Sequence, residues 1–291
     1  MNKISIIKNW RDNIINFNDV SSCGTATATS LPCMFSGMTR SQYNENKAAA
    51  TENVLDVLKH AGIHTIWIDN DLGSKGISKR VTFVNATEEV VNDYCDGDTC
   101  RDDVLFKHLD KALREARQDT LIVLHMIGNH GPAYFLRSDK QTKKFFPECR
   151  TKDLALCTKP EIVNAYDNAV LAVDRFLNAV IDRLEKRPDL ETSMLFVSDH
   201  GESLGENNIY LHAIPYAFAP DFQKKVPMVL WFDNAGRDDL DLDCLRKNAR
   251  KKSHSHDNLF SSLMGLFRVT SKTEYYQKKL DIIGQCKKPS P

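Results

Sequence analysis

Asp199 and His200 are the residues whose types and position best suit chemistry, because they directly follow the apolar run 194–197. Four apolar residues between polar neighbours predict a short buried strand. In an open α/β sheet, ligands bind at the carboxyl ends of the strands. A carboxylate beside an imidazole suits zinc, and Gly201 lets the chain turn away from the metal. The alternative is an Asp-His pair on a solvated loop, which the preceding strand and the Gly-Glu-Ser continuation disfavour.

Further reactive side chains follow two other apolar runs, residues 65–68 and 121–124. Carboxyl ends of parallel strands meet at one edge of a sheet, so side chains that are distant in sequence converge there. The polar residues after these runs, or in the loop after Asp199, are Asn70, Lys75, His130 and His212. Metal ligands and cationic groups at one edge are what metal-assisted phosphoryl or sulfuryl transfer requires, together with a nucleophile.

The candidate nucleophile is a hydroxyl group in the Ser/Thr-rich segment 21–30, which precedes an apolar stretch and looks like the start of a helix. Free backbone N–H groups and the positive end of the helix dipole favour a phosphate at such a position. A threonine hydroxyl becomes nucleophilic when a base or a metal takes its proton. The alternative is that these hydroxyls only cap the helix, as Ser and Thr commonly do.

Alternation of predicted strands and helices indicates an α/β fold with a mainly parallel sheet covered on both faces. Predicted strands are residues 65–68, 121–124, 194–197 and 228–232, and predicted helices are 52–61, 103–116 and 161–185. A chain of 291 residues with 42% hydrophobic composition can bury a substantial core. No shift in composition divides it, so we expect a single domain spanning residues 1–291.

Charge and hydropathy exclude some partners. The formal net charge is zero, from 39 basic and 39 acidic residues, so we expect no nucleic-acid partner. No apolar stretch approaches the roughly 20 residues of a transmembrane helix. Arg11 and Asp12 interrupt the only apolar region near Met1, so no signal peptide is expected.

The eight cysteines nevertheless indicate an exported protein. None forms a C-x-x-C pair, which disfavours a structural zinc cluster, and they lie in polar, loop-like surroundings. An even number in such places predicts disulfides and an oxidising compartment, the alternative being eight reduced thiols. Proximity favours three short pairs and leaves a fourth by elimination: Cys23–Cys33, Cys95–Cys100, Cys149–Cys157 and Cys244–Cys286.

Several segments together resemble a known family. Residues 23–27, 31–36, 128–132 and 198–206 look like motifs of the catalytic domain of the lipid A phosphoethanolamine transferases, which include the mobile colistin-resistance enzymes. The similarity runs from about residue 16 to residue 286. It implies a three-layer α/β/α sandwich of the alkaline-phosphatase and sulfatase type.

The resemblance implies a role for each candidate residue. Thr27 corresponds to the catalytic nucleophile that holds phosphoethanolamine covalently, and Asp199, His200 and Thr27 correspond to zinc ligands. His130 and His212 match histidines that act in catalysis and bind a second zinc or the substrate phosphate. The remaining positions that match the phosphoethanolamine site are Thr25, Asn70 and Lys75.

The resemblance also implies partners and a location. The activity would be transfer of phosphoethanolamine from phosphatidylethanolamine to a lipid A phosphate, with one or two zinc ions, at the periplasmic face of the bacterial inner membrane. It would confer polymyxin resistance. The short cysteine pairs coincide with disulfides expected of the family.

Two departures from the family pattern affect these expectations. Ser74 and Ser78 stand where the family usually has cysteines, so one disulfide is absent and the Lys75 loop is tethered less. We also expect that the chain lacks the family's N-terminal transmembrane region and its first catalytic strand, whose Gly-Glu-Thr glutamate is a zinc ligand. The alternatives are therefore a phosphodiesterase or sulfatase-like hydrolase of the same fold, or an inactive truncated fragment.

Two other histidine positions are predicted to be structural. His125 ends a predicted strand, and we expect it to be buried with a hydrogen bond to the backbone. The Ser-His-Ser-His segment 253–256 is predicted to be a solvated loop rather than a metal-binding tract.

Overall fold

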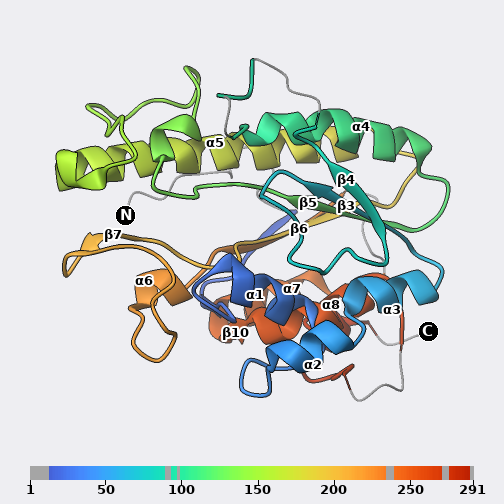
Figure 1. The fold of residues 1–291 in the computed structure, drawn as a ribbon. Coiled ribbons are helices and arrows are strands. Elements are labelled where there is room, and N and C mark those ends of the chain that lie inside the picture. The colour runs from blue at the N-terminus through green and yellow to red at the C-terminus, as the bar shows by residue number, and fades with distance from the viewer. Residues whose placement is uncertain (1–12, 89–92, 97–98, 234–238, 271–274, 289–291) are drawn as a thin grey trace.

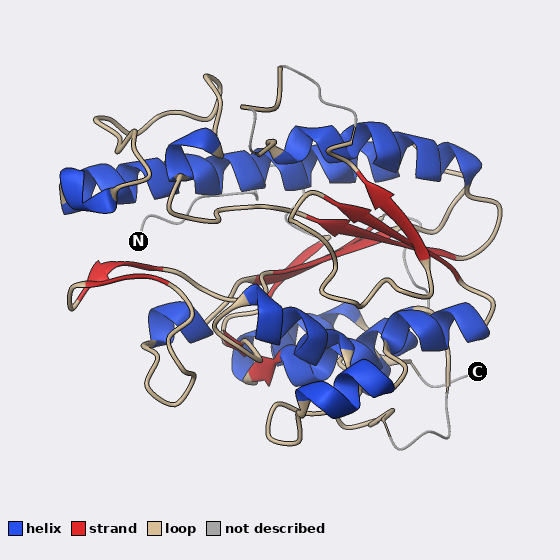
Figure 2. Ribbon diagram, in the orientation of Figure 1, coloured by secondary structure: helices blue, strands red, loops and turns tan. Residues whose placement is uncertain are grey.

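The computed structural model of the protein describes residues 13–88, 93–96, 99–233, 239–270 and 275–288, so the prediction about a signal peptide near Met1 lies outside it. Strands form a middle layer between two layers of helices (Figures 1 and 2). Helices α4 and α5 cover one face, and α1, α3 and α8 cover the other. The predicted three-layer α/β/α sandwich is confirmed.

Each predicted helix is present with small differences at its ends. The helices are α1 (Thr27–Phe35), α2 (Glu45–Ala50), α3 (Val54–His60), α4 (Leu105–Glu115), α5 (Lys159–Glu185), α6 (Asp221–Lys224), α7 (Leu242–Lys251) and α8 (Leu259–Leu266). The long α5 begins at a capping box in which Thr158 and Glu161 satisfy each other's backbone N–H groups. Its apolar stripe, which includes Phe176 and Val180, packs against α4 and the sheet.

The middle layer consists of two three-stranded sheets. In the first, β3 (His64–Asp69) lies between β4 (Thr82–Asn85) and β5 (Thr120–His125), and all three strands are parallel. In the second, β9 (Met228–Phe232) lies between β1 (Ile14–Asn16) and β6 (Ser193–Val197) and is antiparallel to both. All four predicted strands are therefore present.

Two smaller sheets lie near the sequence motifs. β2 (Val20–Ser21) pairs with β10 (His254–Ser255), and β7 (Ser203–Glu206) forms a hairpin with β8 (Ile209–Leu211). The hairpin carries the chain from the Asp-His pair back towards His212. These elements were not predicted, because each has four residues or fewer and β7 has no apolar run.

Two apolar clusters join the layers. Trp67 on β3 is fully buried among side chains of α1, α3 and α8, while Ile68 faces Leu105 and Phe176 of the opposite layer. All four predicted disulfides are confirmed: Cys23–Cys33, Cys95–Cys100, Cys149–Cys157 and Cys244–Cys286. Within the described residues, every helix is too short or too polar to cross a bilayer.

Candidate active site

Thr27 is the first residue of α1, and its hydroxyl points at His200. Ala26 precedes the helix in the cap position, and no side chain caps the helix there. Thr27 Oγ1 instead lies 3.3 Å from Nε2 of His200. The interpretation of Thr27 as a helix cap is therefore wrong, and its hydroxyl faces a titratable group at a helix N-terminus.

The neighbours of His200 fix the state of its ring. Nδ1 lies 2.9 Å from the carbonyl oxygen of Gly201, which only accepts hydrogen bonds, so Nδ1 carries the hydrogen. Nε2 lies 3.3 Å from the hydroxyl of Thr27 and 3.5 Å from Oδ2 of Asp199. A backbone partner on the other ring nitrogen is the usual way to orient a histidine that binds a metal or accepts a proton.

The donor set of this site fits a zinc ion in part. Oδ2 of Asp199 is buried and has no hydrogen-bond partner among the described residues, which suits a cation. The hydroxyl of Thr27, the carboxylate of Asp199 and Nε2 of His200 are the three groups that converge. No group of three or more His, Cys, Asp or Glu side chains in the described part of the chain is arranged to hold a metal. Two such side chains and a hydroxyl are what the site supplies.

His130 and His212 extend this site. The ring of His212 lies 4.3 Å from that of His200 and 5.1 Å from that of His130, between ring centroids. Both carboxylate oxygens of Glu202 lie within 3.3 Å of Nδ1 of His212. This hydrogen bond, more than any other influence, raises the pKa of His212 and favours its charged form. Glu202 was missed as a partner, because its sequence position does not show that β7 and β8 fold it back onto His212.

Thr25 is joined to the loop that carries His212. Its hydroxyl donates to the carbonyl of Ile214 at 2.6 Å, and the N–H of Ala213 donates to the carbonyl of Thr25 at 2.7 Å. Thr25 is buried, so these bonds fix the nucleophile segment against the His212 loop. Of the residues predicted to converge at the strand ends, His130, His200 and His212 lie together, and Thr27 contacts His200.

Asn70 and Lys75 form hydrogen bonds with other groups. Neither makes a hydrogen bond or ion pair with Thr27, His130 or His212 within the residues described. Asn70 is buried and donates to Asp102 and to the carbonyl of Cys100, and its Oδ1 atom has no partner among the described residues. Lys75 is exposed and donates to the carbonyl of Leu72 at 3.2 Å.

Ser74 and Ser78 are joined by a hydrogen bond between their side chains. The two hydroxyls lie 2.6 Å apart where the resemblance would have cysteines, so a hydrogen bond closes this loop.

His125 is buried, as expected, but its partners are carboxylates. Nδ1 lies 2.7 Å from Asp69 Oδ1, and Nε2 lies 3.7 Å from Asp71 Oδ2. Burial alone would raise the pKa of Asp69, but hydrogen bonds from His125, Trp67 and Gly73 outweigh it and lower that pKa. The expected backbone partner for the His125 ring is therefore wrong, and the pair instead orders the end of β3.

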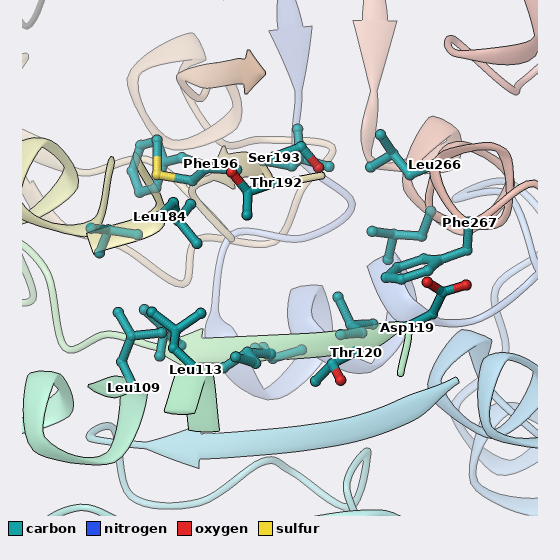
Figure 3. A pocket seen from close by; sticks show the side chains of 18 of the residues that line it. Leu109, Leu113, Asp119, Thr120, Leu184, Thr192, Ser193, Phe196, Leu266 and Phe267 are labelled. Carbon is teal, nitrogen blue, oxygen red and sulfur yellow. The ribbon is translucent and has the colours of Figure 1, made fainter. Parts of the chain in front are cut away.

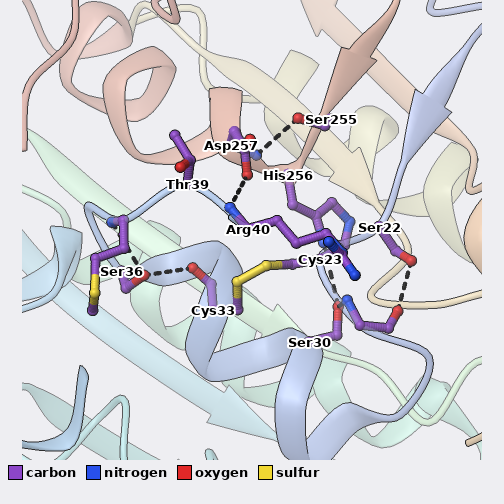
Figure 4. The surroundings of a disulfide bond; sticks show 12 residues. Ser22, Cys23, Ser30, Cys33, Ser36, Thr39, Arg40, Ser255, His256 and Asp257 are labelled. Atoms are coloured by element: carbon purple, nitrogen blue, oxygen red, sulfur yellow. Dashed lines mark hydrogen bonds between the residues drawn. A yellow bond between two sulfur atoms is a disulfide. The ribbon is translucent and has the colours of Figure 1, made fainter. Parts of the chain in front are cut away.

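The burial of His256 contradicts the prediction that segment 253–256 is a solvated loop. The residue is 2% exposed rather than part of a solvated loop. Its Nδ1 accepts the N–H of Cys23 at 3.0 Å, and its Nε2–H donates to the carbonyl of Ser198 at 2.9 Å. Figure 4 shows it beside Cys23, Ser30 and the Cys23–Cys33 disulfide. Burial lowers the pKa of His256 to about 4, so the ring is neutral at pH 7.

This histidine links the segments that carry Thr27 and Asp199. Ser30 on α1 lies 3.3 Å from His256 Nδ1 and donates a hydrogen bond to the carbonyl of Asp199. The partners of His256 are Cys23 and Ser198, which lie 233 and 58 positions away from it in sequence, so no local pattern reveals these contacts.

Comparisons with known proteins agree with this geometry. The sulfatase family model matches residues 1–269. Phosphoethanolamine transferase EptA of Escherichia coli K12 is 47% identical over 283 residues, which are 96% of this chain and 51% of that protein. Phosphatidylethanolamine transferase Mcr-1 of Escherichia coli is 40% identical over 269 residues, which are 89% of this chain and 48% of that protein. The chain thus spans about half the length of these relatives.

A solved structure covers the same region. The soluble domain of lipooligosaccharide phosphoethanolamine transferase A from Neisseria meningitidis is 44% identical and superimposes with a TM-score of 0.93. The match covers 96% of this chain and 84% of that one. The family resemblance seen in the sequence is thereby confirmed, and the chain belongs to the phosphoethanolamine transferases of the sulfatase family.

Proposed function

We propose that this domain performs zinc-dependent transfer of phosphoethanolamine from phosphatidylethanolamine to a lipid A phosphate, through a covalent intermediate on Thr27. The observation that carries the proposal is the Thr27 hydroxyl at the N-terminus of α1, 3.3 Å from Nε2 of His200. The relatives named as phosphoethanolamine transferases support the chemical class.

Thr27, Asp199 and His200 would hold the zinc ion. When bound, zinc lowers the pKa of a coordinated hydroxyl and neutralises phosphoryl oxygens. Thr27 would pass its proton to the ring of His130, and its oxygen would form a bond to phosphorus while the bond from phosphorus to the diacylglycerol oxygen breaks. The N-terminal N–H groups of α1 face the phosphoryl oxygens during this step.

His130 and His212 would handle protons and phosphate charge. Nδ1 of His130 donates to the carbonyl of Gly131, so its Nε2 is free to accept a hydrogen bond or a proton. Glu202 raises the pKa of His212, so His212 suits donation of a proton to the departing diacylglycerol oxygen. In the second half-reaction, a lipid A phosphate oxygen attacks the phosphorus and Thr27 regains its proton, which implies ping-pong kinetics.

The substrate headgroup would lie against Thr25, Asn70 and Lys75. Oδ1 of Asn70 is a buried acceptor without a partner among the described residues, which suits the ammonium of ethanolamine. The phosphatidylethanolamine donor and lipid A acceptor imply work at the periplasmic face of the inner membrane, with polymyxin resistance as the outcome. Four disulfides support an oxidising compartment.

The test is replacement of the hydroxyl. Thr27→Ala in the full-length protein should reduce transfer by roughly 10³-fold or more, because the removed oxygen forms the bond. Thr29→Ala is the control, since it removes an exposed hydroxyl two residues along α1. Intact-mass analysis after incubation with phosphatidylethanolamine should show a phosphoethanolamine adduct on the Thr27 peptide. An adduct that persists in Thr27→Ala would contradict the proposal.

A hydrolase of the same fold is the second candidate, favoured by the sulfatase family match. In that case water would resolve the intermediate and release free phosphoethanolamine without any acceptor. The same assay without lipid A distinguishes the two, because a transferase should retain its adduct. Absence of adduct and of both products would indicate an inactive domain.

A further inference from the structure

A cationic and aromatic surface lies in the loop that follows His212. Arg40, between α1 and α2, places its guanidinium carbon 3.5 Å from the centroid of the Tyr216 ring. Nζ of Lys224 on α6 lies 5.6 Å from the same centroid. Two positive charges from distant parts of the sequence therefore meet at one tyrosine ring. We call Arg40, Tyr216 and Lys224 the cationic cluster.

Backbone hydrogen bonds hold α6 against the candidate active site. The N–H of Ser22 donates to the carbonyl of Lys224 at 2.7 Å, and the N–H of Gly201 donates to the carbonyl of Gln223 at 3.0 Å. Ser22 belongs to the nucleophile segment and Gly201 follows the Asp-His pair, so α6 contacts both segments that form the site. A Cβ atom on Gly201 would lie 2.1 Å from the carbonyl oxygen of Phe222, so glycine is needed for this close approach.

Both cations can take an anion as a partner. Arg40 is exposed and lies in the surroundings of the disulfide at the start of α1 (Figure 4). Its backbone N–H donates to Oδ1 of Asp257 at 2.7 Å, but its guanidinium makes no hydrogen bond or ion pair within the described residues. Lys224 has an ion pair with Asp221 at 3.5 Å, which is weak because the Asp221 side chain is 77% exposed. A guanidinium and an ammonium group are the side chains that most often bind phosphate.

Exposed aromatic side chains lie on the same loop. Phe218 is 83% exposed and Phe222 is 49% exposed, and both stand between Tyr216 and Lys224 in the sequence. Exposed apolar side chains beside charged ones are typical of a surface that meets a ligand or a lipid. A free phosphate ion has no apolar part to contact them, whereas a phosphorylated lipid matches both the cations and the aromatic rings. The loop therefore favours a phosphorylated lipid as its ligand.

We propose that the cationic cluster binds the second phosphate of a bisphosphorylated glycolipid acceptor, the phosphate that is not modified. The inference rests on the proposed transfer function and adds a binding site for the acceptor. The phosphoryl group on Thr27 would have His200 and the N–H groups of α1 as partners, which leaves the cationic cluster for another phosphate. The cluster thus selects and orients the acceptor, and the bond-making step stays with Thr27.

The experiment separates the two half-reactions in the full-length protein. The test variant is Arg40→Gln with Lys224→Gln, and the control is Lys47→Gln, which removes an exposed cation 5.8 Å from the Tyr275 ring. Phosphatidylethanolamine alone should give the Thr27 adduct at rates within about twofold in all proteins, because this step needs no acceptor. The acceptor concentration that half-saturates consumption of the adduct should rise about tenfold or more in the test variant, which loses charge-assisted contacts to phosphate. In the control it should stay unchanged.

Each contrary outcome has a distinct meaning. Normal adduct formation with an unchanged half-saturating concentration in the test variant would overturn this proposal and leave the proposed function standing. An excess of phosphatidylglycerol that raises the wild-type value to that of the test variant would show a site for any anionic phospholipid and would also overturn it. A wild-type protein without adduct, or with an adduct that no acceptor consumes, would contradict the proposed function and this proposal together.

A single variant covers the case in which the test variant does not fold. Arg40→Lys keeps the charge but loses the planar fork that binds phosphate through two hydrogen bonds. It should raise the half-saturating concentration by a smaller factor than the test variant and leave adduct formation unchanged. An unchanged half-saturating concentration in Arg40→Lys would then overturn the proposal.

Discussion

At the residue scale, His256 positions the nucleophile segment without touching Thr27. Its ring joins the N–H of Cys23 to the carbonyl of Ser198, and Ser30 continues the network to the carbonyl of Asp199. The backbone segments on both sides of the Thr27–His200 contact therefore depend on one buried imidazole. A change in that imidazole should alter the geometry of the site before it alters the fold.

We predict that His256→Leu reduces the transfer rate and stability together. It leaves two buried backbone groups without partners, each costing about 1–3 kcal/mol. His256→Asn should recover part of the rate, because its Oδ1 can accept the Cys23 N–H. Measurements are kcat, KM and urea denaturation, with exposed His60→Leu as control. Loss of stability with an unchanged kcat would show that the residue is only structural.

Asp174 on α5 gives a prediction about pH. Burial raises the pKa of its carboxyl to about 6, and its Oδ1 has no partner among the described residues. The pKa in the unfolded chain is about 3.9. The folded state therefore keeps the proton longer, so the free energy of unfolding falls as the pH rises from about 4 to about 6 and stays lower above that.

Asp174→Asn should remove this dependence. At pH 7 the variant should be more stable by on the order of 1 kcal/mol, after allowance for the partial exposure of the group. The difference should shrink to a few tenths of a kcal/mol near pH 4, where the folded carboxyl is protonated and the unfolded one is about half protonated. Urea denaturation at pH 4, 5, 6 and 7 measures it. A difference that is constant with pH would contradict the raised pKa.

At the element scale, α1 is held at its start by the Cys23–Cys33 disulfide as well as by His256. The bridge connects the loop before Thr27 to the second turn of the helix. The first turn, which presents Thr27 and the N-terminal N–H groups, is therefore fixed from both sides. A loss of the bridge should affect both stability and turnover.

We predict that Cys23→Ser with Cys33→Ser lowers the stability by about 2–3 kcal/mol, as a loop of this size implies. It should also reduce the rate, because the Thr27 turn becomes mobile. The control is Cys244→Ser with Cys286→Ser, which opens a larger loop in a different apolar cluster. That pair should lose at least as much stability while the folded fraction keeps its rate. Equal rate losses in both pairs would argue against a specific role for the first.

Sequence reasoning succeeded where a single element carries its own signal. The strands at residues 65–68, 121–124, 194–197 and 228–232 were found, because each is a short, largely apolar run. The Asp199-His200 pair was recognised as a candidate metal site because it directly follows the run 194–197. The spacing of cysteines also sufficed, since three of the four pairs are local.

Sequence reasoning failed where the role of a residue depends on a partner that is distant in sequence. Segment 253–256 is short and polar, which is typical of a loop, but Cys23 and Ser198 bury His256. Glu202 became a partner of His212 only through the β7–β8 hairpin, whose strands are too short for a periodic signal. The polar neighbours of the site could therefore be identified only once the fold was known.

At the scale of the whole molecule, the two sheets meet without pairing. Helices of both layers span the junction, and α5 contributes side chains to clusters on each half of the middle layer. The helices therefore hold the halves together, and a cavity of about 620 Å³ lined by β5 and β6 lies between them (Figure 3). Cohesion of the molecule rests on helix side chains that pack against both halves, and among the described strands backbone pairing occurs only within each half.

This division predicts an alternating pattern of amide exchange in the free chain. In β5 and β6, amides that point to the paired neighbour are protected, and those that point into the cavity between the two sheets are not. Alternate amides of these strands should therefore exchange about 100-fold faster than their neighbours, whereas β3 and β9, paired on both sides, should show no alternation. Residue-resolved exchange by NMR measures both sets in one sample, so β3 and β9 are internal controls. Uniform protection of β5 and β6 would mean that the two edges pair in solution and that the middle layer is one continuous sheet.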